Sequence, residues 1–152
     1  MLDHVTFQTA LFDDELHEPD VDSGMEPTGR ELAGWLKERL SEVPGLRLDE
    51  PIAEDWGWCL RVGTQGVDLY VGCHCDGDAE GDPVPPRWLA FVFCDWEPFK
   101  RFFHRPVDGA KQALARSLHE ALRSCDAVCN VRWYEKSQID AGDRRQGKEQ
   151  PD

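Results

Sequence analysis

Residues 56–96 read WGWCLRVGTQGVDLYVGCHCDGDAEGDPVPPRWLAFVFCDW, and this stretch decides the fold of the chain. It holds three apolar segments, 56–62, 67–75 and 87–96, which are separated by residues typical of turns. Within 67–75, apolar side chains alternate with polar side chains or glycine, and this is the period of two that a half-buried strand requires. The pattern predicts three consecutive strands, which are antiparallel because their links are too short for a crossover helix.

Two features of this stretch refine the prediction. The link 63–66 (GTQG) offers glycines that take positive φ in a tight hairpin between the first two strands. Apolar side chains fill both faces of 87–96, which indicates a central strand or one whose outer face is also covered. Gly57 indicates a bulge or a close backbone approach, and simple alternation places Trp56 and Trp58 on one face.

An amphipathic helix is predicted from Thr28 to about Val43. Thr28 and Glu31 have the spacing of a capping box, in which the first side chain caps the helix and the second reaches back. Pro44 and Gly45 end the pattern. The apolar residues of the segment recur at helical spacing and form one stripe that faces the sheet: Leu32, Trp35, Leu36 and Leu40.

Three more elements complete the expected order β-α-β-β-β-α-β. Alternation predicts strands at 4–12 and 127–134, and a second apolar stripe predicts a helix at about 107–125 with Asp108 as its N-cap. Both helices must bury their stripes, and one face of a single sheet can cover both. We therefore predict an α+β fold, a two-layer sandwich with a mostly antiparallel sheet of about five strands and two amphipathic helices on one face.

Length and composition predict a single domain. The chain has 152 residues, 40% of them hydrophobic, which is enough to bury a core. We expect the domain to span 1–135. Residues 13–29 form an acidic loop rich in turn residues, for which an acidic docking surface is the alternative, and 136–152 form a disordered polar tail.

The formal net charge of −13 limits the classes of partner. It argues against nucleic acid, which needs a basic face, and against an anionic membrane surface. It favours a basic protein partner, because opposite charge raises association rates. No apolar run approaches the length of about 18–20 residues that spans a membrane, and the N-terminus lacks the pattern of a secretory signal. We expect a cytoplasmic protein whose six cysteines are reduced.

Sequence motifs give no support for an enzyme. The nucleophile elbow, the phosphate-binding loop and the dinucleotide fingerprint are all absent from the sequence. Cysteine and histidine are present, but without the local signatures of a catalytic pair. Glu54 and Asp55 are adjacent and would diverge in a strand, so they make a poor acid–base pair. The expectation therefore leans towards a protein that is not an enzyme.

Candidate metal ligands are concentrated in 73–82 (CHCDGDAEGD). Cys73 and Cys75 lie at i and i+2 of a strand and point the same way, as shared ligands of zinc must, whereas His74 points to the other face. Asp76, Asp78 and Gly81 match three positions of a calcium loop, but its twelfth position is Arg87 rather than the required Glu. No cofactor is assigned, and zinc or calcium remains a hypothesis against the alternative of buried apolar thiols. The candidate ligands are Cys73, His74, Cys75, Asp76 and Asp78, with Cys59 and Cys94 as further sulfur donors.

A candidate partner-binding cluster lies at the start of the decisive stretch. Glu54 and Asp55 place two carboxylates beside Trp56 and Trp58. Tryptophan is among the residues most enriched at binding hot spots, so an exposed indole here would anchor a partner. Packing of the indoles in the core is the alternative interpretation.

A candidate anion site follows the third strand. Lys100, Arg101, His104 and Arg105 form a basic cluster in an acidic chain and could hold a phosphate or carboxylate. Pairing of these groups with nearby Asp and Glu is the alternative.

The leading functional hypothesis is a non-enzymatic protein-binding module, inhibitor-like or immunity-like, that faces a basic protein. One alternative is a metal-binding protein that uses the hairpin at 73–82. Another is a small-molecule-binding domain that uses an outer sheet face with Tyr70, Phe91 and Phe93. A monomer and a homodimer are both compatible with the sequence, because a second copy could cover an apolar outer face.

Overall fold

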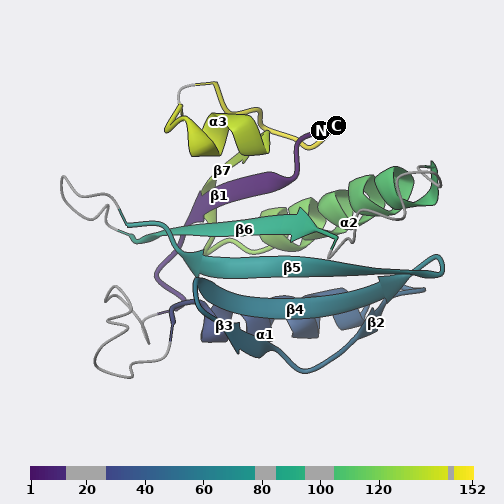
Figure 1. The fold of residues 1–152 in the computed structure, drawn as a ribbon. Coiled ribbons are helices and arrows are strands. Elements are labelled where there is room, and N and C mark those ends of the chain that lie inside the picture. Colours follow the sequence, from purple (N-terminus) through teal and green to yellow (C-terminus); the bar gives the residue numbers. More distant parts are fainter. Residues whose placement is uncertain (13–26, 78–84, 95–104, 144–145) are drawn as a thin grey trace.

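The structure is a computed structural model that describes residues 1–12, 27–77, 85–94, 105–143 and 146–152. In these ranges one sheet of seven strands packs against helices (Figure 1). The elements are β1 (His4–Gln8), α1 (Arg30–Ser41), β2 (Arg47–Leu48), β3 (Ile52–Glu54), β4 (Gly57–Thr64), β5 (Val67–Cys75), β6 (Arg87–Phe93), α2 (Arg105–Arg123), β7 (Cys129–Tyr134) and α3 (Lys136–Asp140).

The sheet has the order β2-β4-β5-β6-β1-β7, and β3 also pairs with β4. Each pairing is antiparallel, and β1 lies between β6 and β7. The predicted meander is confirmed as β4-β5-β6, and β5 has the predicted bounds. The predicted α+β class with a mostly antiparallel sheet is also confirmed, but the described chain has seven strands and three helices rather than five and two.

The core lies between the sheet and the helices α1 and α2, which Figure 1 shows behind the strands. Each helix buries a leucine stripe, as the periodicity predicted, and each buried leucine contributes about 1.5–3 kcal/mol before conformational entropy is counted. Trp35 is only partly buried and packs edge-on against Phe12, with ring centroids 5.9 Å apart. No described helix combines the length and the apolar character needed to cross a membrane. The buried stripes are Leu32, Leu36 and Leu40 in α1 and Leu114, Leu118 and Leu122 in α2.

The start of α1 corrects the predicted capping box. Thr28 does not cap the helix; its Oγ1 accepts a hydrogen bond of 2.9 Å from the backbone N–H of Cys75. Gly29 is the N-cap residue, with φ of 112°, and a Cβ at this position would overlap the Cys73 carbonyl. A tertiary contact with β5 therefore replaces the local cap, so that the helix begins against the sheet.

The hairpin between β4 and β5 has a two-residue turn. Thr64 pairs with Val67, and the turn residues Gln65 and Gly66 have φ of 50° and 78°. Two consecutive positive φ values are the signature of the turn whose twist matches a β-hairpin. The hairpin prediction is confirmed, although Gly63 belongs to β4 and only Gly66 uses the freedom of glycine.

The chain beyond Glu135 differs from the disordered tail that its composition predicted. It forms α3, whose start is fixed by a 2.9 Å hydrogen bond from the Glu135 N–H to Gln138 Oε1. Further on, Lys148 pairs with Trp133 through two backbone hydrogen bonds of 2.8 Å. The bridge at Lys148 joins the described end of the chain to the edge strand β7, and composition alone does not reveal such pairing.

We predict that Gly29→Ala destabilises the fold by about 2 kcal/mol or more, because alanine is strained at this positive φ and its Cβ overlaps the β5 backbone. The matched control is Gly34→Ala in the middle of α1, where a Cβ meets nothing within 4 Å. That substitution should stabilise the protein by about 1 kcal/mol through helix propensity. Urea unfolding curves measure both, and equal midpoints for the two variants would contradict the close approach at Gly29.

Candidate functional site

The second face of the sheet, which we call the outer face, is turned away from α1 and α2 (Figure 1). Because side chains alternate along each strand, the residues between the core-facing ones lie here. In β5 and β6 these include Tyr70, Phe91 and Phe93, which are all partly buried. The structure therefore places a group of large aromatic side chains on the face that the described helices leave uncovered.

Ring contacts join four side chains into what we call the aromatic cluster: Trp56, Tyr70, Phe91 and Phe93. Phe93 stacks on Tyr70 with ring centroids 5.4 Å apart, and it lies 5.4 Å from Phe91. The indole of Trp56 covers this pair, 5.2 Å from Phe91 and 6.1 Å from Phe93. Offset and edge contacts of this kind contribute about 0.5–1.5 kcal/mol each beyond the area they bury, so the rings hold one another in place.

Gly72 allows the cluster to lie flat on the sheet. It is the cross-strand partner of Phe91, and a Cβ on Gly72 would overlap the Phe91 ring. The ring therefore lies directly over the β5 backbone, where a larger residue would displace it. Covering a strand glycine with an aromatic ring from the neighbouring strand is an established way to stabilise a sheet at a weak position.

Trp56 reaches the outer face because it belongs to a turn. Glu54 pairs with Gly57, so Asp55 and Trp56 form the two-residue link between β3 and β4. A turn residue is not bound by strand alternation, and the prediction that Trp56 and Trp58 share a face is therefore wrong. Trp56 remains 40% exposed, although it packs on two phenylalanines.

Trp58 lies on the core face instead. It is 9% exposed, and its Nε1–H donates a 2.9 Å hydrogen bond to the carbonyl of Pro27. The guanidinium of Arg30 lies 5.4 Å from the centre of its ring. Trp58 thus joins the start of α1 to the sheet, while the other predicted partner-binding residues, Glu54, Asp55 and Trp56, lie together in the β3–β4 hairpin.

The carboxylates of this hairpin differ from those at the opposite end of β4. Glu54 and Asp55 are exposed, and neither has an ion-pair partner among the described residues. In contrast, Asp68 and Asp49 both bind Arg61, at 2.7 Å and 3.2 Å. The negative charge beside Trp56 is therefore not neutralised by the described part of the chain.

A histidine extends the aromatic cluster on β1. The ring of His4 stacks on Phe91 at 5.1 Å, and its Nδ1 lies 2.8 Å from Asp3 Oδ1. Asp3 also binds Lys111 at 3.1 Å. Burial alone would raise the pKa of Asp3, but the His4 hydrogen bond and the Lys111 charge lower it below its usual value. The sequence holds no signal for this cluster, because Lys111 is 108 positions from Asp3 along the chain.

Two neighbours fix the position of the His4 imidazole. Among the described side chains, its hydrogen-bond partner is Asp3, and its ring stacks on Phe91. The arrangement orients the imidazole and supports Phe91.

The candidate metal ligands of β5 point in different directions. Cys73 is buried in the core, and burial and then the charge of Cys59 raise the pKa of its thiol far above the usual range. Cys75 is on the same side and its thiol donates to the Arg87 carbonyl, while the Nδ1 of His74 lies 3.0 Å from the Cys75 carbonyl. No group of three or more His, Cys, Asp or Glu side chains in the described ranges has the arrangement of a metal site.

The further sulfur donors do not complete such a site. Phe93 is paired with Tyr70, so Cys94 lies opposite Leu69, four residues from Cys73 along β5. At about 3.3 Å per residue this separation is roughly 13 Å, whereas zinc binds sulfur at about 2.3 Å. Cys59 is paired with Gly72, so its side chain points to the outer face and that of Cys73 to the core.

Several predicted residues lie outside the described ranges. They are Asp78 of the metal hypothesis, most of the acidic loop 13–29, and Lys100, Arg101 and His104 of the candidate anion site. Arg105 is the first residue of α2. The predictions for these residues stay predictions.

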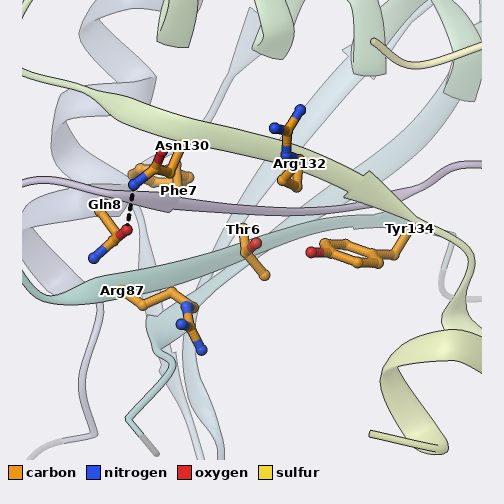
Figure 2. Close-up of a pocket in the computed structure, with 7 residues that line it drawn as sticks. All are labelled: Thr6, Phe7, Gln8, Arg87, Asn130, Arg132 and Tyr134. Atoms are coloured by element: carbon orange, nitrogen blue, oxygen red, sulfur yellow. Dashed lines mark hydrogen bonds between the residues drawn. The ribbon is translucent and has the colours of Figure 1, made fainter. Parts of the chain in front are cut away.

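Two polar basins adjoin β7. The outer basin, about 150 Å³ in volume, lies on the outer face over β1 (Figure 2). In that view Thr6 and Tyr134 lie between Arg87 and Arg132, whose guanidinium groups point away from one another. The edge basin, about 240 Å³, lies on the other side of Arg132 beside α2. The outer basin is lined by Thr6, Phe7, Gln8, Arg87, Asn130, Arg132 and Tyr134, and the edge basin by His119, Arg123, Asn130, Val131, Arg132, Glu149 and Gln150.

Comparison with known proteins gives no family. No family model, no curated protein and no solved structure matches the chain. Any functional assignment must therefore follow from the geometry of these surfaces.

We predict that the Cys73 thiol resists labelling by an alkylating reagent in the folded protein at pH 9, while the exposed Cys129 reacts. The raised pKa of Cys73 also links its proton to stability. Above the ordinary thiol pKa of about 8.5, the unfolded chain loses this proton and the folded chain keeps it. Stability must therefore fall with rising pH, by up to about 1.4 kcal/mol per pH unit for this group.

The control for this prediction is Cys73→Ala. Unfolding curves between pH 8 and pH 10 should show a shallower decline of stability for this variant, whatever its stability at neutral pH. Equal slopes for both proteins, or rapid labelling of Cys73 in the folded protein, would contradict the burial of the thiol.

Proposed function

We propose that this protein is a non-enzymatic protein-binding module, inhibitor-like or immunity-like, whose aromatic cluster and β3–β4 hairpin dock a basic protein. The observation that carries the proposal is the setting of Trp56. Its indole is 40% exposed, lies over Phe91 and Phe93, and follows two carboxylates that have no ion-pair partner in the described chain.

The packing of Trp56 supports a role as an anchor. A flexible exposed side chain loses about 0.5–1.5 kcal/mol of rotamer freedom when a partner immobilises it. Contacts with Phe91 and Phe93 already restrict the indole, so most of this cost is met in the free protein. The exposed face of the ring is then available to a partner. Tryptophan is among the residues whose truncation at an interface most often costs about 2 kcal/mol or more of binding free energy.

Charge defines the chemistry of the partner. Arginine and lysine bind the face of an indole with about 0.5–2 kcal/mol, and the same groups pair with carboxylates. Glu54 and Asp55 lie next to Trp56 in the hairpin, so a basic protein that docks here meets both features. The net charge of −13 adds a long-range attraction for a basic protein, which raises the rate of association.

The same surface is less suited to a small molecule. Small-molecule sites are concave and enclose most of the ligand. Neither of the two basins is lined by Trp56, Tyr70 or Phe93, so neither opens onto the aromatic cluster. In the described part of the chain, no helix covers the aromatic cluster, so its side of the sheet offers a partner an extended contact area.

We predict that Trp56→Ala abolishes retention of the partner while the protein stays folded. Quantitative mass spectrometry of proteins captured from a lysate of the source cells compares the wild type with this variant. The matched control is Leu11→Ala, an apolar side chain that is 43% exposed and follows β1, outside the β3–β4 hairpin. Trp56→Ala should reduce stability by about 1–3 kcal/mol, because two ring contacts are lost.

The expected result is a basic protein captured by the wild type and by Leu11→Ala but lost with Trp56→Ala. If the wild type and Trp56→Ala capture the same proteins in equal amounts, the aromatic cluster is not the docking surface. A captured protein that is acidic would contradict the proposed chemistry.

A second prediction isolates the two carboxylates. The double variant Glu54→Gln with Asp55→Asn should weaken binding at about 0.1 M salt and lose most of this difference at about 1 M, where the Debye length falls from about 10 Å to about 3 Å. Its control, Glu38→Gln with Glu42→Gln, removes the same formal charge from exposed positions on and just after α1. Equal weakening by both double variants would mean that net charge alone, and not the hairpin, attracts the partner.

A further inference from the structure

The edge basin brings basic groups from two elements together in an acidic protein. His119 and Arg123 come from α2, and Arg132 comes from β7. The carboxylate in the lining is Glu149, from the segment that pairs with β7 through Lys148. The basin lies at the β7 edge of the sheet, whereas the β3–β4 hairpin lies at the opposite edge. The proposed function does not involve the basin.

The ring of His119 is held in one tautomer. The indole Nε1–H of Trp133 can only donate, and it lies 3.2 Å from His119 Nδ1. Nδ1 is therefore the acceptor, and in the neutral ring the proton is carried by Nε2. Burial and the nearby charge of Arg123 lower the pKa of His119, against a smaller opposing effect of Glu120, which favours the neutral ring. The basin is thus lined by an imidazole with a fixed N–H donor.

The guanidinium groups of Arg123 and Arg132 both act on the carboxylate of Glu149. Arg132 Nη1 binds Glu149 Oε1 at 2.9 Å, whereas Arg123 has no ion-pair partner among the described residues. The hydrogen bond and charge of Arg132 lower the pKa of Glu149, and Arg123 adds to this effect. In the free protein, the carboxylate of Glu149 therefore lies at the position where Arg123 and Arg132 attract an anion.

The contact between Arg132 and Glu149 is exposed, with 81% of the Glu149 side chain accessible to solvent. Exposed ion pairs contribute only about 0.2–1 kcal/mol, so an anion with better geometry can displace this carboxylate. A guanidinium group offers parallel N–H donors that match the oxygens of carboxylate and phosphate.

A bulge in β7 shapes the wall of this basin. Between the pairs Thr6–Arg132 and Gln8–Cys129, β7 contains one residue more than β1. Asn130 lies at this irregularity with φ of 53°, and its Nδ2 donates a 2.6 Å hydrogen bond to Gln8 Oε1. Bulges re-aim side chains and occur often beside active sites, and asparagine is one of the few non-glycine residues that adopt a positive φ readily.

From these observations we propose that the edge basin binds an oxyanion, the phosphate monoester or carboxylate group of a small ligand. Arg123 and Arg132 supply the charge, His119 supplies an N–H donor, and Glu149 occupies the place of the ligand in the free protein. A volume of about 240 Å³ admits the anionic end of a ligand and excludes a macromolecule from the basin itself.

The test follows the indole N–H resonance of Trp133 by nuclear magnetic resonance, because this proton bonds directly to His119. Inorganic phosphate and, separately, acetate are titrated at constant ionic strength. We expect a saturable shift with at least one of them. Saturation with phosphate alone identifies a phosphate site, and saturation with acetate alone identifies a carboxylate site.

Two variants give opposite expectations. Glu149→Gln should tighten binding by up to about fivefold, the factor that matches the loss of a competing exposed ion pair of about 1 kcal/mol. Arg123→Gln should weaken binding about tenfold or more. The control is Arg116→Gln, the same substitution at an exposed position of the same helix, which should leave the affinity unchanged.

The proposal is overturned if neither anion gives a saturable shift in the wild type or in Glu149→Gln. It is also overturned if Arg116→Gln weakens binding as much as Arg123→Gln, because the attraction is then general. An unchanged or weaker affinity in Glu149→Gln would show that this carboxylate does not occupy the anion's place.

Discussion

The backbone of β5 at Cys73 and His74 is approached from two sides by glycines, and the rest of the molecule depends on this contact. Gly29, at the start of α1, and Gly57, at the start of β4, both lie where a Cβ would overlap the Cys73 carbonyl. Beside them, Thr28 binds the N–H of Cys75. The first contact sets how close α1 lies to the sheet and therefore how deeply its leucines are buried.

The second contact positions the candidate docking surface. Gly57 directly follows Trp56, so its close approach to β5 brings the indole over the neighbouring aromatic rings. Gly72 does the same for Phe91 from the other strand. Three glycines thus position the core on one face of β5 and the aromatic cluster on the other. The part of the Trp56 ring that does not pack against the cluster stays exposed.

Sequence analysis predicted the elements whose pattern is local. The alternation in β5 gave its bounds, and the leucine stripes of α1 and α2 are buried as expected. β2 and β3 escaped detection because two or three residues are too few to show a period, and they exist only through pairing with β4. The same reason explains the order of the segment after Glu135, where pairing with β7 replaces the missing apolar pattern.

Some residues of the candidate site could not be placed from the sequence, for a different reason. Trp56 was assigned to a strand face by alternation, but the turn between β3 and β4 releases it from that rule. Thr28 had the spacing of a cap and is used by β5 instead. The cluster of Asp3, His4 and Lys111 joins residues 108 positions apart along the chain, which no spacing rule can bring together. Tertiary contacts override local preference at each of these places.

The distribution of charge shows why a net value of −13 is compatible with both a cationic partner and an anionic ligand. Arg47 and Arg61 pair with the carboxylates of Asp49 and Asp68 at one end of β4, whereas those of the hairpin have no ion-pair partner in the described chain. At the opposite edge, Arg123 and Arg132 outnumber the carboxylate of Glu149. Five strand spacings of about 4.8 Å separate the two edges by roughly 24 Å, more than twice the Debye length of about 10 Å at 0.1 M salt. Each edge therefore presents its own local charge to a ligand, and total charge governs only the approach of a partner from afar.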